Sequence, residues 1–165
     1  VSEPSEILRL MNKGIKQALN QGRSQDAQED GMDMTICSFP HDLSEVTIAM
    51  ANHSAILIQE GQTKQIEGDI FPIGGLFSRD QNVTYTEKTI SLNKGDQIFL
   101  YSDGFKDQIS QVNKMYGSVN FIKFLTRLST VENPEDQLNG LENEFNKWKG
   151  QTKQIDDILI MGIKI

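Results

Sequence analysis

The chain has 165 residues, of which 37% are hydrophobic and 24% are charged, a composition typical of a globular domain with a sizeable core. Its formal net charge is −7 and it has no run of Lys or Arg, which argues against nucleic acid or an anionic membrane surface as the main partner. The longest apolar stretch, residues 158–163, is far shorter than the roughly 20 residues of a membrane-spanning helix. Composition therefore favours a globular domain without membrane contact.

The single cysteine, Cys37, cannot form an intramolecular disulfide, and no grouping of Cys and His offers the ligands of a structural zinc site. A reducing, cytoplasmic setting fits these features best. The chain begins at Val1 and shows no signal-peptide pattern, so we expect it to be part of a longer protein.

The first predicted element is an amphipathic helix. Apolar residues recur at helical spacing from Ile7 to Leu19, after a start signal at Pro4, and the helix is expected to end near Gly22. From Gly31 onward, short apolar runs separated by turns predict strands. These strands are expected near residues 32–36, 46–50, 55–59, 62–66, 84–92 and 97–101, with a glycine turn at 60–61 closing a hairpin.

Helical spacing returns in the last third of the chain. One helix is expected after Ser118, a candidate N-cap, and another after Asn133, which precedes a proline and two acidic residues. The final segment, residues 155–165, is apolar enough to predict a buried strand. No repeat or linker divides the chain, so residues 1–165 are expected to form a single domain. Its order of elements predicts an α+β fold with antiparallel sheet and helices in separate layers.

Two aspartates are expected to meet at one end of this sheet. Asp103 directly follows strand 97–101, and Gly104 beside it can adopt turn conformations that other residues resist. Asp156 precedes the last strand, so the two carboxylates would lie roughly 5 Å apart if these strands are antiparallel neighbours. Two such anions call for a cation, and ligand sets made of oxygen select hard ions such as Mg²⁺ or Mn²⁺. The alternative is a common Ser-Asp-Gly turn and a solvated pair of aspartates.

Other candidates for chemistry are weaker. Cys37 lies in a predicted strand and is expected to be a core residue, because no histidine is placed near it by the sequence. His41 and His53 stand in turn-like contexts, where a surface or capping role is the expectation. Gly74-Gly75 resembles a flexible turn, since neither the spacing nor the lysine of a phosphate-binding loop follows.

Eight segments of the chain resemble, in order, the SpoIIE-type phosphatases, which are bacterial members of the metal-dependent protein phosphatase (2C-like) class. The segments are residues 4–8, 30–34, 51–53, 71–75, 94–96, 101–108, 148–150 and 155–158. The resemblance covers nearly the whole chain. It implies an α+β fold, an antiparallel β-sandwich flanked by helices and incomplete at its N-terminus, with two or three Mg²⁺ or Mn²⁺ ions at one end.

The resemblance also implies a mechanism, in which a metal-bound water attacks the phosphorus of phosphoserine or phosphothreonine and no protein nucleophile is required. By position, Asp103 corresponds to the metal-bridging aspartate, and Asp156 corresponds to the aspartate that opens the last strand and binds a core ion. Asp107 and Asp30 correspond to carboxylates that hold a third, weaker ion in some members. Asp157 is expected to be a neighbour of the site and not a ligand.

The chain departs from the family pattern in one respect. It lacks the early Gly-Asp strand and the Asp-x-x-Gly-His-Gly segment that the first half of the family's domain carries, so we expect roughly the first third of that domain to be absent from this chain. We therefore expect an incomplete metal site, little activity in this part alone, and uncovered apolar surface that promotes self-association.

The implied function is hydrolysis of phosphoserine on a regulatory protein of the anti-anti-sigma type, in bacterial signal transduction, with a sensor region upstream in the parent protein. Two alternatives remain open. One is a non-catalytic signalling module that binds a phosphorylated partner without turning it over. The other is a plain β-sandwich interaction domain, for which the ordered resemblance would be coincidental.

Overall fold

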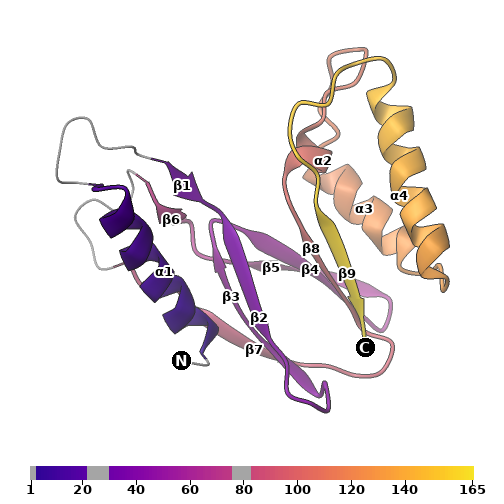
Figure 1. Cartoon of the computed structure of the whole chain (residues 1–165). Coiled ribbons are helices and arrows are strands. Elements are labelled where there is room, and N and C mark those ends of the chain that lie inside the picture. Colours follow the sequence, from indigo (N-terminus) through magenta and orange to yellow (C-terminus); the bar gives the residue numbers. More distant parts are fainter. Residues whose placement is uncertain (1–2, 22–29, 76–82) are drawn as a thin grey trace. The chain divides into compact units, whose positions relative to one another are not determined.

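The computed structural model describes residues 3–21, 30–75 and 83–165 (Figure 1). The chain divides into two compact units. The first comprises the described parts of residues 1–54 and 66–94 together with Ile165, and the second comprises residues 55–65 and 95–164. Over the described ranges, no helix is long and apolar enough to cross a membrane.

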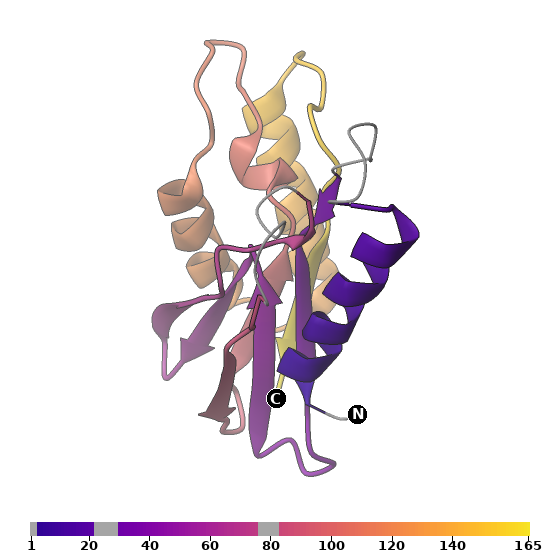
Figure 2. The same ribbon diagram turned by 90° about the vertical axis from the view of Figure 1, so that its left-hand side faces the viewer.

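The first unit is built from one helix and short antiparallel strands. Helix α1 (Pro4–Ala18) begins with a proline, whose missing N–H costs nothing in the first turn. Its apolar face, centred on the fully buried Leu8, packs against strands β2 (Met34–Ser38), β3 (Glu45–Ala51) and β6 (Ile73–Gly74) (Figures 1 and 2). Three strands form one sheet in the order β2, β3 and β7 (Glu87–Ser91). A separate short pair consists of β1 (Gly31–Met32) and β6.

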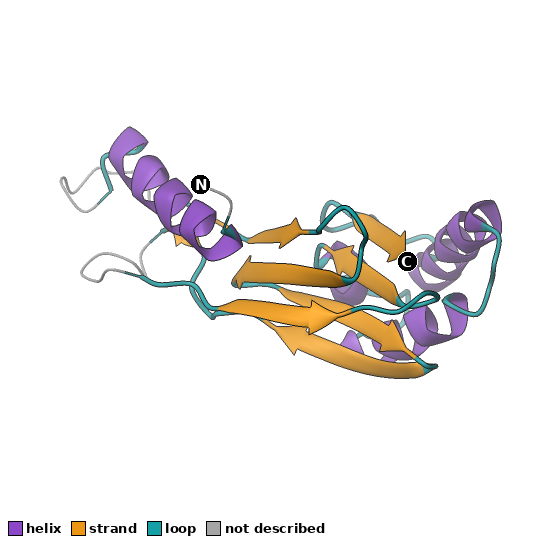
Figure 3. Cartoon of the chain, turned by 90° about the horizontal axis from the view of Figure 1, so that it is seen from below, coloured by secondary structure: helices purple, strands orange, loops and turns teal. Residues whose placement is uncertain are grey.

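The second unit holds most of a four-stranded sheet and the other helices of the described ranges (Figure 3). The strand order is β5 (Gln62–Glu67), β4 (Ser54–Gln59), β8 (Gln97–Tyr101) and β9 (Ile160–Lys164). Glu60 and Gly61 have φ of 50° and 74°, as the tight turn of the β4–β5 hairpin requires. The helices are α2 (Gly104–Asp107), α3 (Ser118–Leu128) and α4 (Pro134–Lys149).

A cluster of aromatic rings fixes α2 in the second unit. The Phe105 side chain is 2% exposed, and its ring centroid lies 5.2 Å from those of Tyr116, Phe121 and Phe145. Such ring pairs add to the stabilisation that burial of apolar area alone provides. Because Phe105 is two residues after Asp103, the core holds the backbone next to that aspartate in place.

The structure confirms the predicted α+β class. The strands of each sheet pair antiparallel, and each unit also contains helices. Helix α1, the β4–β5 hairpin and strand β8 lie where the sequence predicted them. The Asn133 cap is also confirmed, because its side-chain oxygen accepts a hydrogen bond of 2.9 Å from the Glu135 N–H. The first helix ends at Ala18, however, which is earlier than the predicted end near Gly22.

Two predictions about helix α3 and the last strand were also wrong. Ser118 does not cap α3: the N-cap is Gly117, whose φ of 82° is open to glycine, and Ser118 is the first helical residue. The last strand is shorter and less buried than its composition suggested. β9 begins only at Ile160 and lies at the end of the strand order, so Met161 is 50% exposed.

Candidate metal centre

Strands β8 and β9 are antiparallel neighbours, as the predicted meeting of Asp103 and Asp156 requires. Tyr101, the last residue of β8, pairs with Ile160, the first residue of β9. The chain therefore leaves β8 and enters β9 at the same end of the sheet. The segments that bear Asp103 and Asp156 start from this common end, two residues after Tyr101 and four residues before Ile160.

Ser102 joins these two segments directly. Its N–H donates a hydrogen bond of 2.8 Å to the Leu159 carbonyl, which extends the ladder by one rung beyond β8. Its hydroxyl donates to the Asp157 carbonyl at 2.9 Å and accepts from the Leu159 N–H at 2.8 Å. Ser102 had no predicted role, although its place directly before Asp103 and Gly104 was the available signal.

Gly104 is required for space, and the prediction that it allows an unusual turn was wrong. It is the first residue of α2, and its φ is not positive. A Cβ at this position would overlap the Asp157 carbonyl group and lie 3.2 Å from the Asp156 carbonyl oxygen. Glycine thus lets the start of α2 approach the backbone of the segment that carries Asp156.

Asp103 and Asp107 lie one helical turn apart. The Asp107 N–H donates to the Asp103 carbonyl at 3.0 Å, and residues at this spacing share a helix face. The Asp103 carboxylate is exposed and does not cap α2, whereas the Asp107 carboxylate forms an ion pair of 3.2 Å with Lys106. Asp103 is therefore the freer of the two as a ligand.

The other two predicted ligands lie in different units. Asp156, in the second unit, is exposed, and its Oδ1 accepts a hydrogen bond of 2.7 Å from the Asp157 N–H. Asp30, in the first unit, directly precedes β1, and its backbone carbonyl accepts a hydrogen bond of 2.8 Å from Gln21 Nε2. The second unit alone thus supplies Asp103, Asp107 and Asp156.

The donor set fits a hard divalent cation in its chemistry. Carboxylates and backbone carbonyls offer oxygen alone, which suits Mg²⁺ and Mn²⁺ and disfavours soft metals. Within residues 3–21, 30–75 and 83–165, however, no group of three or more His, Cys, Asp or Glu side chains is close enough to hold an ion. Convergence of the four predicted carboxylates on one metal centre therefore stays a prediction.

The surroundings of Cys37 and His53 indicate roles in the fold and not in catalysis. Cys37 lies in β2, and burial raises the pKa of its thiol to about 11, so the thiol is protonated and a poor nucleophile at neutral pH. The His53 Nδ1 atom lies 2.6 Å from the Thr35 hydroxyl, within hydrogen-bonding distance. Neither side chain suggests covalent catalysis.

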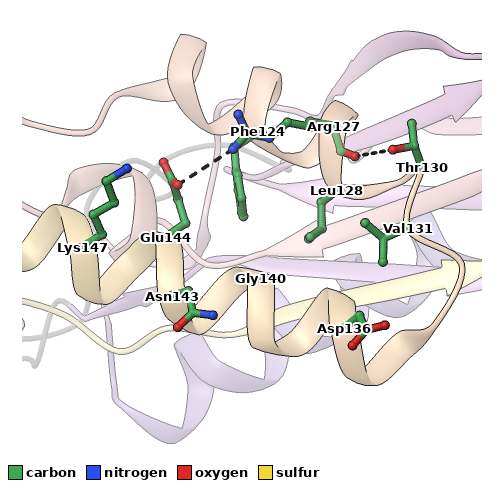
Figure 4. Close-up of a pocket in the computed structure, with 10 residues that line it drawn as sticks. All are labelled: Phe124, Arg127, Leu128, Thr130, Val131, Asp136, Gly140, Asn143, Glu144 and Lys147. Carbon is green, nitrogen blue, oxygen red and sulfur yellow. Dashed lines mark hydrogen bonds and ion pairs between the residues drawn. The ribbon is translucent and has the colours of Figure 1, made fainter.

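A groove lies between α3 and α4, and none of the four predicted metal ligands lines it (Figure 4). Its volume is about 370 Å³. Arg127 lies 5.5 Å above the Phe124 ring and 3.8 Å from the Glu144 carboxylate, so its charge is already partly matched. The groove mixes cationic, acidic and apolar side chains, and its lining residues are Phe124, Arg127, Leu128, Thr130, Val131, Asp136, Gly140, Asn143, Glu144 and Lys147.

Comparison with solved structures shows a shared fold. The SiaA-PP2C domain of Pseudomonas aeruginosa superposes with a TM-score of 0.83 at 20% identity, covering 99% of this chain and 61% of that one. The RsbU and RsbW domains of Rv1364c from Mycobacterium tuberculosis give 0.71 at 15% identity, covering 97% and 41%. The catalytic domain of the serine threonine protein phosphatase PstP, in complex with two manganese ions, gives 0.64 at 15% identity, covering 96% and 67%.

These likenesses identify the fold as that of the PP2C-type phosphatase domains, although the chain spans only 61% and 41% of the first two structures. No match was found among curated proteins. At the level of sequence, residues 2–165 match the family described as Stage II sporulation protein E. This match extends over almost the entire chain and agrees with the fold, and the chain therefore belongs to the Stage II sporulation protein E (SpoIIE) family.

Proposed function

We propose that this chain is the C-terminal part of the catalytic domain of a Mg²⁺- or Mn²⁺-dependent protein serine/threonine phosphatase. Its substrate is phosphoserine on a bacterial regulatory protein of the anti-anti-sigma type, in a cytoplasmic signalling pathway. The observation that carries the proposal is the close approach at Gly104. There, the start of α2 contacts the backbone of the segment that bears Asp156, while Asp103 directly precedes this helix and Asp107 is its last residue.

The roles of the residues follow from their correspondence by position to the SpoIIE-type phosphatases, and carboxylate oxygens suit hard divalent cations. Asp103 and Asp156 hold the core ions, and Asp107 and Asp30 hold a weaker one. A bound divalent cation lowers the pKa of water and neutralises charge on the phosphate oxygens. The protonated Cys37 is not needed as a nucleophile. The manganese ions in the PstP structure, a protein with the same fold, support this choice of metal.

Residues outside this chain complete the proposed site. The chain spans 61% of the SiaA domain, and the missing Asp-x-x-Gly-His-Gly segment belongs to the family's first half. We therefore assign the remaining ligands, and a sensor region beyond them, to the preceding part of a longer protein. Residues 1–165 alone are then inactive.

The first experiment is metal removal from the full-length protein. We expect release of phosphate from a phosphoserine protein in MnCl₂, loss of release after treatment with EDTA, and recovery when Mn²⁺ is added back. The measurement is inorganic phosphate over time. An equal rate in the presence of EDTA would contradict metal dependence, and no release under any metal would contradict the phosphatase proposal.

A non-catalytic signalling module is the second candidate. It is favoured by the lack of a three-residue metal-binding group among the side chains of the described ranges. Such a module would bind a phosphorylated partner in Mn²⁺ and leave the phosphate in place. Mass spectrometry of the recovered partner separates the two candidates, because only the enzyme changes its mass.

Self-association of the isolated chain is expected through the β9 edge. β9 ends the strand order and exposes Met161, with Leu159 65% exposed just before it. Open sheet edges with apolar side chains pair readily, and a charged side chain among those apolar residues disfavours the pairing. Light scattering should show a dimer for the chain and a monomer for Met161→Lys. Met115→Lys, which changes a methionine that is 58% exposed outside the strands, should leave the dimer intact, and a monomeric unmodified chain at high concentration would refute this expectation.

A further inference from the structure

Gln108 is a fully buried polar residue that links two segments of the candidate site. It follows α2 directly, and its side chain is 0% exposed. Its Nε2 lies 3.0 Å from the carbonyl oxygens of Ile109 and Lys153 and 3.3 Å from the Thr152 hydroxyl. Its Oε1 accepts a hydrogen bond of 3.4 Å from the Ile155 N–H. The amide group thus holds the loop that follows α4.

The backbone of Gln108 is also held in place. Its carbonyl accepts hydrogen bonds from the Tyr116 N–H at 3.0 Å and from the Trp148 indole N–H at 2.9 Å. The two aromatic side chains are in edge contact with ring centroids 5.1 Å apart, and both belong to the core of the second unit. The side-chain amide of Gln108 therefore extends from a rigid base.

The loop that Gln108 holds has no regular secondary structure. Residues 151–159 lie between α4 and β9 and form neither helix nor strand. Asp156 lies in this loop between Ile155 and Asp157. The Ile155 N–H is bound by the Gln108 side chain, and the Asp157 carbonyl is bound by the Ser102 hydroxyl. Hydrogen bonds from both ends of the Ser102–Gln108 segment thus bracket Asp156.

We propose that Gln108 is a positioning residue that sets Asp156 against Asp103 and Asp107 for metal binding, an inference that rests on the proposed function. Gln108 itself is buried and would touch neither metal nor substrate. Its effect would come from the loop backbone, which it fixes at Lys153 and Ile155. Groups that orient metal ligands in this way typically change metal affinity by 10- to 100-fold when they are removed.

The test compares two buried glutamines in the full-length protein. Gln108→Met keeps the size of the side chain and removes its hydrogen bonds to the loop. The control is Gln97→Met, because Gln97 is only 7% exposed, is the first residue of β8, and donates a hydrogen bond of 2.7 Å to the Ser129 carbonyl. The probe is Mn²⁺ alone, with the unbound ion measured by electron paramagnetic resonance. We expect the dissociation constant to rise about tenfold or more for Gln108→Met and by less than twofold for Gln97→Met.

Amide hydrogen exchange at residues 153–157, measured without metal, provides a second readout. Gln108→Met should accelerate exchange there, and Gln97→Met should not. If Gln108→Met fails to fold, Gln108→Asn replaces it, because this variant keeps a buried amide that is one methylene too short to reach Lys153. Unchanged Mn²⁺ affinity in the Gln108 variant, or equal weakening in both variants, would overturn the inference.

The two readouts separate failure of this inference from failure of the proposed function. A wild-type protein that binds Mn²⁺ and hydrolyses phosphoserine, with a Gln108 variant that behaves identically, would overturn the role of Gln108 alone. A wild-type protein that neither binds Mn²⁺ nor releases phosphate would overturn the proposed metal site, and the metal-positioning role of Gln108 with it. Faster loop exchange in Gln108→Met would then show that Gln108 only stabilises the loop.

Discussion

Asp103→Asn should lower manganese-dependent hydrolysis of phosphoserine by the full-length protein about 100-fold or more. A neutral amide provides one weakly donating oxygen where the carboxylate provides two charged ones, and stabilisation of charge by bound metal contributes several kcal/mol to such reactions. The Asp103 side chain is exposed and does not cap α2, so the fold does not depend on it. The measurement is the initial rate of phosphate release at saturating Mn²⁺, alongside thermal unfolding.

The matched control for this variant is Asp136→Asn, an identical chemical change at an exposed carboxylate in the first turn of α4. It should keep the wild-type rate. Both variants should change the free energy of unfolding by only about 0.5 kcal/mol, as is usual for surface positions. Retention of full activity by Asp103→Asn would remove Asp103 from the site, and a large loss of stability would show that its role is structural.

The part of the site that could be predicted from the sequence is the part that depends on local patterns. The apolar run before Asp103 and the apolar run after Asp156 each indicated a buried strand. Antiparallel pairing of the two runs then placed both aspartates at one end of the sheet. Helix caps such as Asn133 are likewise written in three or four consecutive residues.

The remaining features depend on contacts between residues far apart in the chain. Gln108 reaches Lys153, 45 residues away, and nothing in the local pattern marks a glutamine as buried. The burial of β9 was overestimated because apolar composition does not reveal whether a strand lies at the edge or in the centre of a sheet. The need for glycine at position 104 was also missed, because the group that leaves no room for a side chain there is the carbonyl of Asp157, far away in the chain.

Gly104→Ala should therefore damage the site by a route different from that of Asp103→Asn. The added Cβ would overlap the Asp157 carbonyl group, which is backbone and cannot rotate away as a flexible side chain could. Either α2 or the segment with Asp156 must then move, at a cost of about 1–3 kcal/mol in the free energy of unfolding. Because a displacement of about 1 Å at a reacting centre can cost about 100-fold in rate, we expect phosphate release to fall to a similar extent.

The control is Gly14→Ala, the same substitution in the middle of α1, where no heavy atom lies within 4 Å of the new Cβ. It should stabilise the protein by about 0.5–1 kcal/mol, because alanine is the better helix former, and leave the rate unchanged. Chemical denaturation and the phosphatase assay together decide the outcome. If Gly104→Ala had the stability and the rate of phosphate release of the wild type, the start of α2 and the Asp157 backbone could not be in close contact. A loss of stability with full activity would place that contact outside the metal site.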